Sequence, residues 1–314
     1  MIKKIISCPK CDFEQESSDE CVNCGIIFNK IRNRTDTTAG TPANAALSRP
    51  EKNAGMPGGS FRLLRILILL LLLFFVVMSA VLTKIRSTDW DQPLRVVVYP
   101  INGDKSSAAS EYIASLKKES FVPIEDFMRQ EAEQYELALD DPVTFRLAPE
   151  VKAVPPKPPQ GGNLFNVIWW SLQLRYWSCS VDTYDGPSAD IRMFVVYFDP
   201  RGFQRLDDSL GLQKGLIGVV YAYASRKLAS KDNVVITHEL LHTLGATDKY
   251  DPASRQPVHP DGFAEPGRHP LFPQEMAAVM GTRIPLSKTS VKMPEGLDEV
   301  VIGEKTAREI KWVE

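Results

Sequence analysis

Histidine and cysteine, the residues that most often bind transition metals, are scarce in this chain of 314 residues, which holds four and five of them. Their placement is uneven, because four cysteines precede residue 25 and all four histidines lie between residues 238 and 269. The net charge of −2 provides no excess of positive charge, so nucleic acid is not expected as a partner. With 44% hydrophobic residues, the chain is not disordered throughout. Metal binding is therefore the first hypothesis.

The first 32 residues contain two Cys-x-x-Cys pairs, Cys8 with Cys11 and Cys21 with Cys24. Each pair can direct two thiolates at one ion from a tight turn, so the two pairs predict a closed, structural zinc site. Such a small module needs the metal to supply its folding free energy. Two disulfides or a redox-active pair are the alternatives. The segment resembles the short zinc ribbons at the N-termini of some bacterial membrane proteins, and we expect a cytosolic protein partner for it.

Residues 33–62 and 63–83 differ sharply in composition. The first segment is rich in Thr, Ala, Asn, Gly, Pro and Ser, which predicts a flexible linker. The second contains an uncharged apolar run from Ile66 to Thr83, about the length of a helix that crosses a bilayer. Five consecutive leucines leave no polar face for a buried soluble helix, and the run starts too late for a cleaved signal peptide. We expect a transmembrane helix over residues 63–83 that contacts the lipid bilayer.

The cysteines indicate how this helix is oriented, because the flanking basic residues are nearly balanced. These residues are Arg49, Lys52, Arg62 and Arg65 before the run, and Lys84, Arg86 and Arg95 after it. A reduced four-cysteine site belongs in the cytosol, and the region after the run has only Cys179 and cannot form an internal disulfide. We therefore expect a single-pass protein of the bacterial inner membrane with a cytoplasmic N-terminus. Its C-terminal domain is expected to be extracytoplasmic, on the periplasmic side in a Gram-negative cell.

Residues 90–314 alternate predicted strands and helices, which favours one domain with an α+β or α/β fold. Strands are predicted at 95–100, 193–198 and 218–223, and helices at 108–118, 124–139, 164–176 and 232–244. Six prolines between residues 142 and 162 predict an extended surface loop. The cluster of Trp169, Trp170 and Trp177 is expected to pack in the core.

The helix predicted at 232–244 carries the sequence His238-Glu-Leu-Leu-His242 and is followed by Gly245, which suits a left-handed helix end. Side chains four residues apart share one helix face, so both imidazoles can reach a single zinc ion. Glu239 would lie beside the open coordination position and act as general base. The pattern predicts a catalytic zinc centre for amide hydrolysis. A purely structural histidine pair and a metal site without catalysis are the alternatives.

The run from His238 to Asp248 resembles the HExxHxxGxxH motif of the metzincin metallopeptidases, with aspartate in the last position. The resemblance covers residues 216–285 and implies an α+β domain with a mixed sheet and an active-site helix. It also implies that Gly245 turns the chain and that Asp248 is the third zinc ligand, a variant associated with small bacterial proteases of the snapalysin type. Carboxylate oxygen is an accepted zinc ligand. The alternative third ligands are Glu275, at a spacing seen in gluzincins, His259 and His269.

Two further features follow from the same resemblance. Met280, in Ala278-Val-Met-Gly281, is similar to the methionine turn that lies under the metal in metzincins, although methionine is also a common core residue. Residues 216–225 occupy the place of the edge strand that binds extended peptide by strand addition. Residues 90–215 resemble no family that we can name.

Together these patterns predict a membrane-anchored zinc metalloendopeptidase with one catalytic and one structural Zn²⁺, acting on a protein or peptide substrate. Two other functions stay open from sequence. One is zinc-dependent hydrolysis of a non-peptide bond in the cell envelope. The other is a non-catalytic membrane adaptor or sensor.

Overall fold

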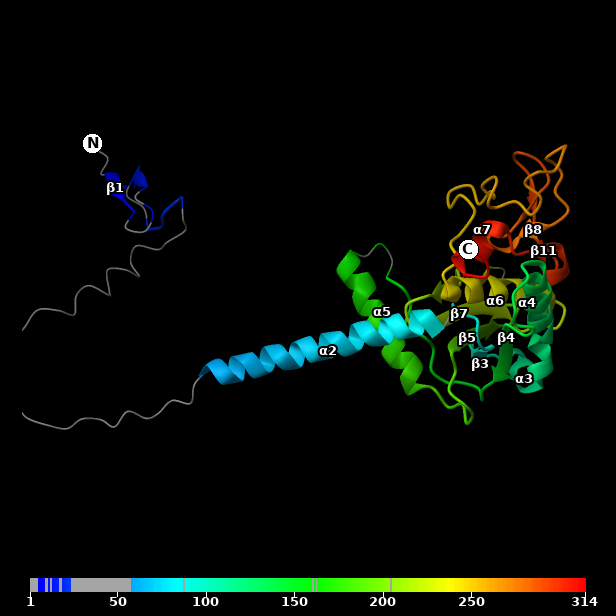
Figure 1. Cartoon of the computed structure of the whole chain (residues 1–314), viewed down its shortest axis with the longest axis horizontal. Helices are drawn as coiled ribbons and strands as arrows, with labels where there is room; N and C mark the ends of the chain where they lie inside the picture. The colour runs from blue at the N-terminus through cyan, green and yellow to red at the C-terminus, as the bar shows by residue number, and fades with distance from the viewer. Residues whose placement is uncertain are drawn as a thin grey trace, which may run out of the picture. The chain divides into compact units, whose positions relative to one another are not determined.

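The computed structural model describes residues 5–8, 11, 13–16, 19–23, 58–86, 88–159, 161, 163–203 and 205–314 (Figure 1). The chain forms two compact units, residues 1–62 and residues 63–314. The larger unit contains the central sheet and the histidines, and the smaller contains the N-terminal cysteines.

The smaller unit contains an antiparallel hairpin of β1 (Ile5–Ser7) and β2 (Glu14–Glu16). The turn between them is closed by the amide of Cys8, which donates to the carbonyl of Phe13 at 3.0 Å. The Gln15 side chain accepts a hydrogen bond from the Val22 amide and donates one to the Glu20 carbonyl. A single side chain thus fastens the segment around Cys21 to the hairpin.

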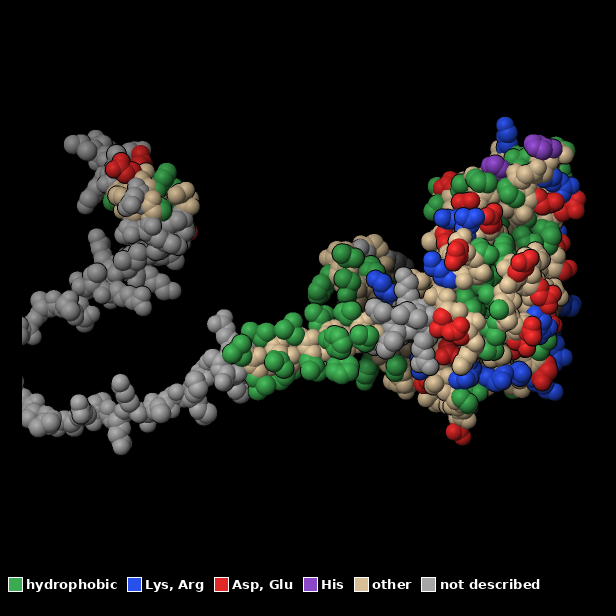
Figure 2. All heavy atoms as spheres, viewed as in Figure 1, with side chains coloured by type: hydrophobic (Ala, Val, Ile, Leu, Met, Phe, Trp, Pro, Cys, Tyr) green, Lys and Arg blue, Asp and Glu red, His purple; other side chains and the backbone are tan. Residues whose placement is uncertain are grey.

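Helix α2 (Gly58–Arg86) contains the apolar run for which the sequence predicts a membrane span. Its large apolar side chains are exposed over residues 63–78 and form a hydrophobic surface along the helix (Figure 2). Within the part of the chain that the structure describes, however, no helix has both the length and the apolar character of a span. The predictions of a transmembrane helix at 63–83 and of a single-pass membrane location are therefore wrong.

The larger unit is built on a five-stranded mixed sheet with the strand order β4-β3-β5-β7-β6. Its parallel strands are β3 (Leu94–Asn102), β4 (Val143–Leu147), β5 (Ile191–Phe198) and β7 (Ile217–Tyr223). The short β6 (Leu210–Leu212) runs antiparallel to β7. The predicted α+β class with a mixed sheet is confirmed for this unit.

Two predictions about segments of this sheet need correction. Segment 216–225, expected at the sheet edge, forms β7, which lies inside the sheet between β5 and β6, so β6 is the edge strand. Segment 142–162, expected to be a loop throughout, contains β4. Pro142 does not prevent this, because it precedes the strand and its carbonyl accepts a hydrogen bond from the Leu94 amide.

Alternate residues of the parallel strands face two separate cores, as a strand's period of two requires. On one face, Val96, Val98 and Val195 pack with side chains of α3 (Ser107–Ser115), η1 (Lys118–Phe121), α4 (Val122–Gln134) and α6 (Ala229–Leu244). On the other face, Val97, Tyr99 and Phe194 pack against α5 (Leu164–Ser180). The strands read as continuous apolar runs because both faces of the sheet are covered (Figure 1).

The prediction that the three tryptophans of α5 pack in the core is only partly right. Trp170 and Leu174, four residues apart, lie on the stripe that faces the sheet, with Trp177 packed beside them. Trp169 is rotated off this stripe and is 58% exposed, so the core-packing prediction is wrong for that residue.

Small elements close the larger unit beside α6. They are β8 (Ala277–Ala278), η2 (Val279–Gly281), β9 (Ile284–Pro285), β10 (Val291–Lys292), η3 (Leu297–Glu299), β11 (Val300–Val301) and α7 (Glu304–Glu309). β8 pairs in parallel with β11, and β9 pairs with β10. The C-terminal residues are anchored in the core by buried Trp312 and by Trp90, whose indole donates to the Ile310 carbonyl.

Candidate functional site

Helix α6 carries the candidate site and is fixed at both ends. Near its start, the Asp232 carboxylate accepts a hydrogen bond from the Tyr223 amide at the end of β7. At its end, Gly245 has a φ of +108°, and an added Cβ would lie 2.4 Å from Nε2 of Gln213. Strand β6 passes so close that a Cβ on Gly211 would lie 2.6 Å from Cβ of His242. Glycine at these two positions lets the edge strand and the helix exit pack against the histidine turn.

Three predicted ligand residues, His238, His242 and Asp248, direct their polar atoms to one point. The two Nε2 atoms are 3.0 Å apart, and Oδ1 of Asp248 lies 3.3 Å from His238 Nε2 and 3.1 Å from His242 Nε2. In a tetrahedral zinc site with bonds of about 2.0 Å, ligand atoms lie about 3.3 Å apart. The triangle therefore fits three ligands of one metal ion.

The other ring nitrogen of each histidine contacts a backbone carbonyl. His238 Nδ1 lies 3.1 Å from the Val279 oxygen, and His242 Nδ1 lies 2.8 Å from the Ala246 oxygen. Because a carbonyl only accepts, Nδ1 of each ring donates to it, so Nε2 is the nitrogen that can bind a metal once it gives up any proton that it shares with Asp248. The rings are thus held in the orientation that metal binding needs.

Glu239 lies beside this triangle and is 5% exposed. Its Oε2 is buried and receives no hydrogen bond from the described part of the chain. Burial raises the pKa of the Glu239 carboxyl. Glu239 and His238 line a cleft of about 900 Å³, to which Tyr250 and Tyr223 also contribute. The buried Glu239 residue therefore lies at the wall of a cleft, next to the candidate metal ligands.

The site's charges are strongly coupled. Burial opposes ionisation of Asp248, but hydrogen bonds with the two histidines outweigh it and hold the pKa of Asp248 well below its ordinary value. Burial lowers the pKa of His242, whereas the hydrogen bond to Asp248 and the nearby charge of Glu239 raise it. The net pKa of His242 is above its ordinary value. Asp248 is therefore ionised at neutral pH, as a ligand must be.

The loop that carries Asp248 is held from two sides. The amide of Lys249 donates to the carbonyl of Met280 at 2.8 Å. Met280 is fully buried in η2, directly after Val279, whose oxygen contacts His238. On the other side, the Glu309 carboxylate accepts hydrogen bonds from Thr247 and Lys249. The turn around Met280 thus touches both the helix and the loop of the triangle.

The alternative third ligands lie elsewhere. Glu275 is exposed and pairs with Arg268 at 2.7 Å. His259 Nε2 contacts the carbonyl oxygen of Pro266, and His269 is exposed. Among the described residues, the group around His238 and His242 contains Asp248 and none of these three.

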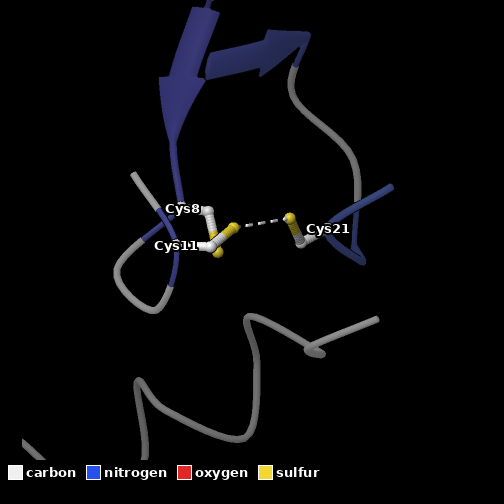
Figure 3. A group of neighbouring side chains, drawn as sticks. All are labelled: Cys8, Cys11 and Cys21. Carbon is white, nitrogen blue, oxygen red and sulfur yellow. Dashed lines mark hydrogen bonds between the residues drawn. The ribbon is translucent and has the colours of Figure 1, made fainter. Parts of the chain in front are cut away.

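A second group is formed by Cys8, Cys11 and Cys21 (Figure 3). The sulfurs of Cys11 and Cys21 are 3.7 Å apart, close to the about 3.8 Å expected for two thiolates on one tetrahedral zinc ion. Asn23 Nδ2 donates to the Cys11 sulfur. The fourth predicted ligand, Cys24, lies outside the described residues. Two groups of side chains that can hold a metal ion are therefore present among the described residues.

Several residues of the histidine site are not found by motif. Tyr250 lines the cleft, and burial together with the nearby charge of Asp248 raises its pKa. Its position two residues after Asp248 is the only sequence signal for it. Glu309 lies 62 residues from Thr247, and no local pattern links the two. No protein-family model matches the chain, and no curated protein is significantly similar to it.

Proposed function

We propose that the chain is a zinc metallopeptidase of the metzincin type, with His238, His242 and Asp248 as zinc ligands and Glu239 as general base. The observation that carries this proposal is the convergence of three ligand atoms at tetrahedral spacing beside a buried carboxylate oxygen that has no hydrogen-bond partner among the described residues. A merely structural histidine pair would not need such an oxygen, since burying an unpartnered polar atom costs free energy.

The donor set fits zinc. Two neutral imidazoles and one carboxylate are the ligands of many catalytic zinc sites, and three protein ligands leave a fourth position open. When bound, zinc supplies a Lewis acid that polarises a carbonyl and acidifies water. The cysteine group of Cys8, Cys11 and Cys21, completed by Cys24, fits a closed structural zinc site instead.

The chain's own residues supply the proton transfers. The Glu239 carboxylate takes a proton from the attacking water and delivers it to the nitrogen of the leaving amine. Its raised pKa favours the first step, because a carboxylate that holds a proton more strongly is a better base. The Val279 and Ala246 carbonyls keep His238 and His242 in one orientation throughout.

The substrate is expected to lie along β6. No strand among the described residues pairs with its outer edge, so its backbone groups can bind an extended peptide by strand addition. The cleft of about 900 Å³ lies on the side of His238 and Glu239, and a second cavity of about 350 Å³ is lined by His242, Gly211 and Gly245. Each cavity therefore borders one of the two ligand histidines and offers room for part of a bound peptide.

The test compares Glu239→Gln with Glu275→Gln, which changes an exposed glutamate that is paired with Arg268. Full-length protein is loaded with zinc and incubated with fluorescence-quenched peptides of mixed sequence. We expect Glu239→Gln to retain zinc and lose about 10²–10⁴-fold in cleavage rate, and Glu275→Gln to match the unmodified chain. Undiminished cleavage by Glu239→Gln would remove this residue from the mechanism.

A further inference from the structure

The third ligand of the histidine triangle is the least confined of the three. The side chain of Asp248 is 41% exposed, whereas those of His238 and His242 are 10% and 18% exposed. The two histidines are fixed by a helix and by backbone carbonyls, but Asp248 lies in the loop after Gly245. Some other contact has to order this loop if its carboxylate is to meet the metal without a large loss of conformational entropy.

Two charged residues, Lys249 and Glu309, order the loop that carries Asp248. Lys249 is 6% exposed, and its ammonium donates to the Thr247 carbonyl, the Thr247 hydroxyl and Glu309, each at 2.7 Å. Glu309 in turn accepts from the Thr247 amide and hydroxyl, both at 2.9 Å. All three ammonium protons are used, and every bond ends on a residue adjacent to Asp248 or on Glu309.

Glu309 is itself held firmly, although it is far away in sequence. It ends α7, whose following residues Ile310 and Trp312 are buried in the core. Its backbone oxygen lies 3.7 Å from where a Cβ on Gly245 would be, so α7 packs against the exit of α6. The C-terminal helix therefore connects the core to both residues that flank the third ligand.

We propose that Lys249 and Glu309 form a positioning clamp that holds Asp248 in ligand geometry and thereby sets the metal affinity of the histidine centre. This inference rests on the proposed function, because it takes Asp248 as a zinc ligand. Neither residue belongs to the ligand group, and both act through Thr247 and the backbone around Asp248. Residues that orient a metal ligand in this way typically change affinity by about 10–100-fold when they are replaced.

The test measures zinc and cobalt affinity by competition titration. It uses the full-length chain with Cys11→Ser and Cys21→Ser, so that the histidine centre is the one being titrated. The first variant is Glu309→Gln. The second combines Lys249→Met with Glu309→Leu, which avoids a buried unpaired charge and so keeps the fold intact. We expect each to weaken zinc binding about 10–100-fold and to alter the visible spectrum of bound cobalt.

The decisive comparison is made in an Asp248→Ala background. A clamp that acts through Asp248 has nothing left to position there, so we expect the same replacements to cause no further loss of affinity. Equal weakening with and without Asp248 would overturn the clamp and leave a general effect on folding. Unchanged affinity in both variants would overturn it as well.

The matched control is Glu299→Gln, which breaks a lysine–glutamate pair with Lys292 that has no contact with residues 247–249. We expect it to leave zinc affinity unchanged. His238→Ala separates the two proposals. If zinc binding survives His238→Ala, the proposed function fails; if it depends on His238 but not on Glu309, only the clamp fails.

Discussion

The two candidate metal centres differ in what surrounds their ligands. Cys8 and Cys21 are at most 1% exposed, yet the regular structure beside them is a hairpin of two three-residue strands. His238 and His242 sit on a 16-residue helix that packs in the main core, and His238 borders a cleft. Where the core builds the scaffold, a metal ion can keep an open position for chemistry. Where little core exists, the metal itself has to stabilise the fold.

Among the variants that test this difference between the two centres, Gly245→Ala is expected to have the largest effect on stability and zinc binding, although it changes no ligand. Gly245 has a positive φ, and its new Cβ would meet Gln213, so the exit of α6 and the Asp248 loop must shift. We expect a loss of about 1–3 kcal/mol in unfolding free energy and weaker zinc binding at the histidine centre alone. Urea denaturation and zinc titration measure the two effects.

Gly267→Ala is the control for this variant, because nothing lies within 4 Å of the added Cβ. It should leave both stability and zinc affinity unchanged. If Gly245→Ala also keeps full zinc affinity, the histidine centre does not depend on the helix exit. The surrounding fold would then not position the ligands of the histidine centre, and the proposed difference between the two centres would be wrong.

A smaller effect is expected from pH. The pKa of His242 is raised above its ordinary value of 6.5 and a protonated imidazole cannot bind zinc, so protons compete at a higher pH than for an isolated histidine. Zinc affinity should fall as pH decreases through that raised pKa and level off above it. Asp248 contributes no such loss near neutrality, because its pKa is well below the ordinary value.

Zinc titrations between about pH 5.5 and 8.5 measure this dependence, with Asp248→Asn as the comparison. Removing the aspartate charge should move the loss of affinity to lower pH, since the hydrogen bond that raises the pKa of His242 is weakened. A midpoint that stays in place in Asp248→Asn would show that Asp248 does not set the protonation of the histidine.

The sequence predicts the parts of the site that have local causes. Helical spacing places His238 and His242 on one face, and Gly245 ends the helix in a left-handed conformation. The class of the larger unit follows from its alternating strands and helices. Each of these depends on residues that are close together in the chain.

The features of the site that the sequence does not predict depend on residues that are far apart in the chain. The contact of Glu309 with Thr247, the edge position of β6 and the carbonyl of Val279 all come from tertiary packing that no local pattern encodes. The predicted membrane span came from an apolar run judged by composition. Within the described residues, no helix, including α2 with this run, is both long and apolar enough to span a membrane.

Zinc content tests the central claim of two separate metal centres most directly. Full-length protein, dialysed against buffer with limiting zinc, is analysed for bound metal by mass spectrometry. We predict two zinc ions per chain, one lost in His238→Ala and the other lost in the Cys11→Ser, Cys21→Ser chain, as the two ligand groups require. A His238→Ala variant that retains both ions would contradict the account.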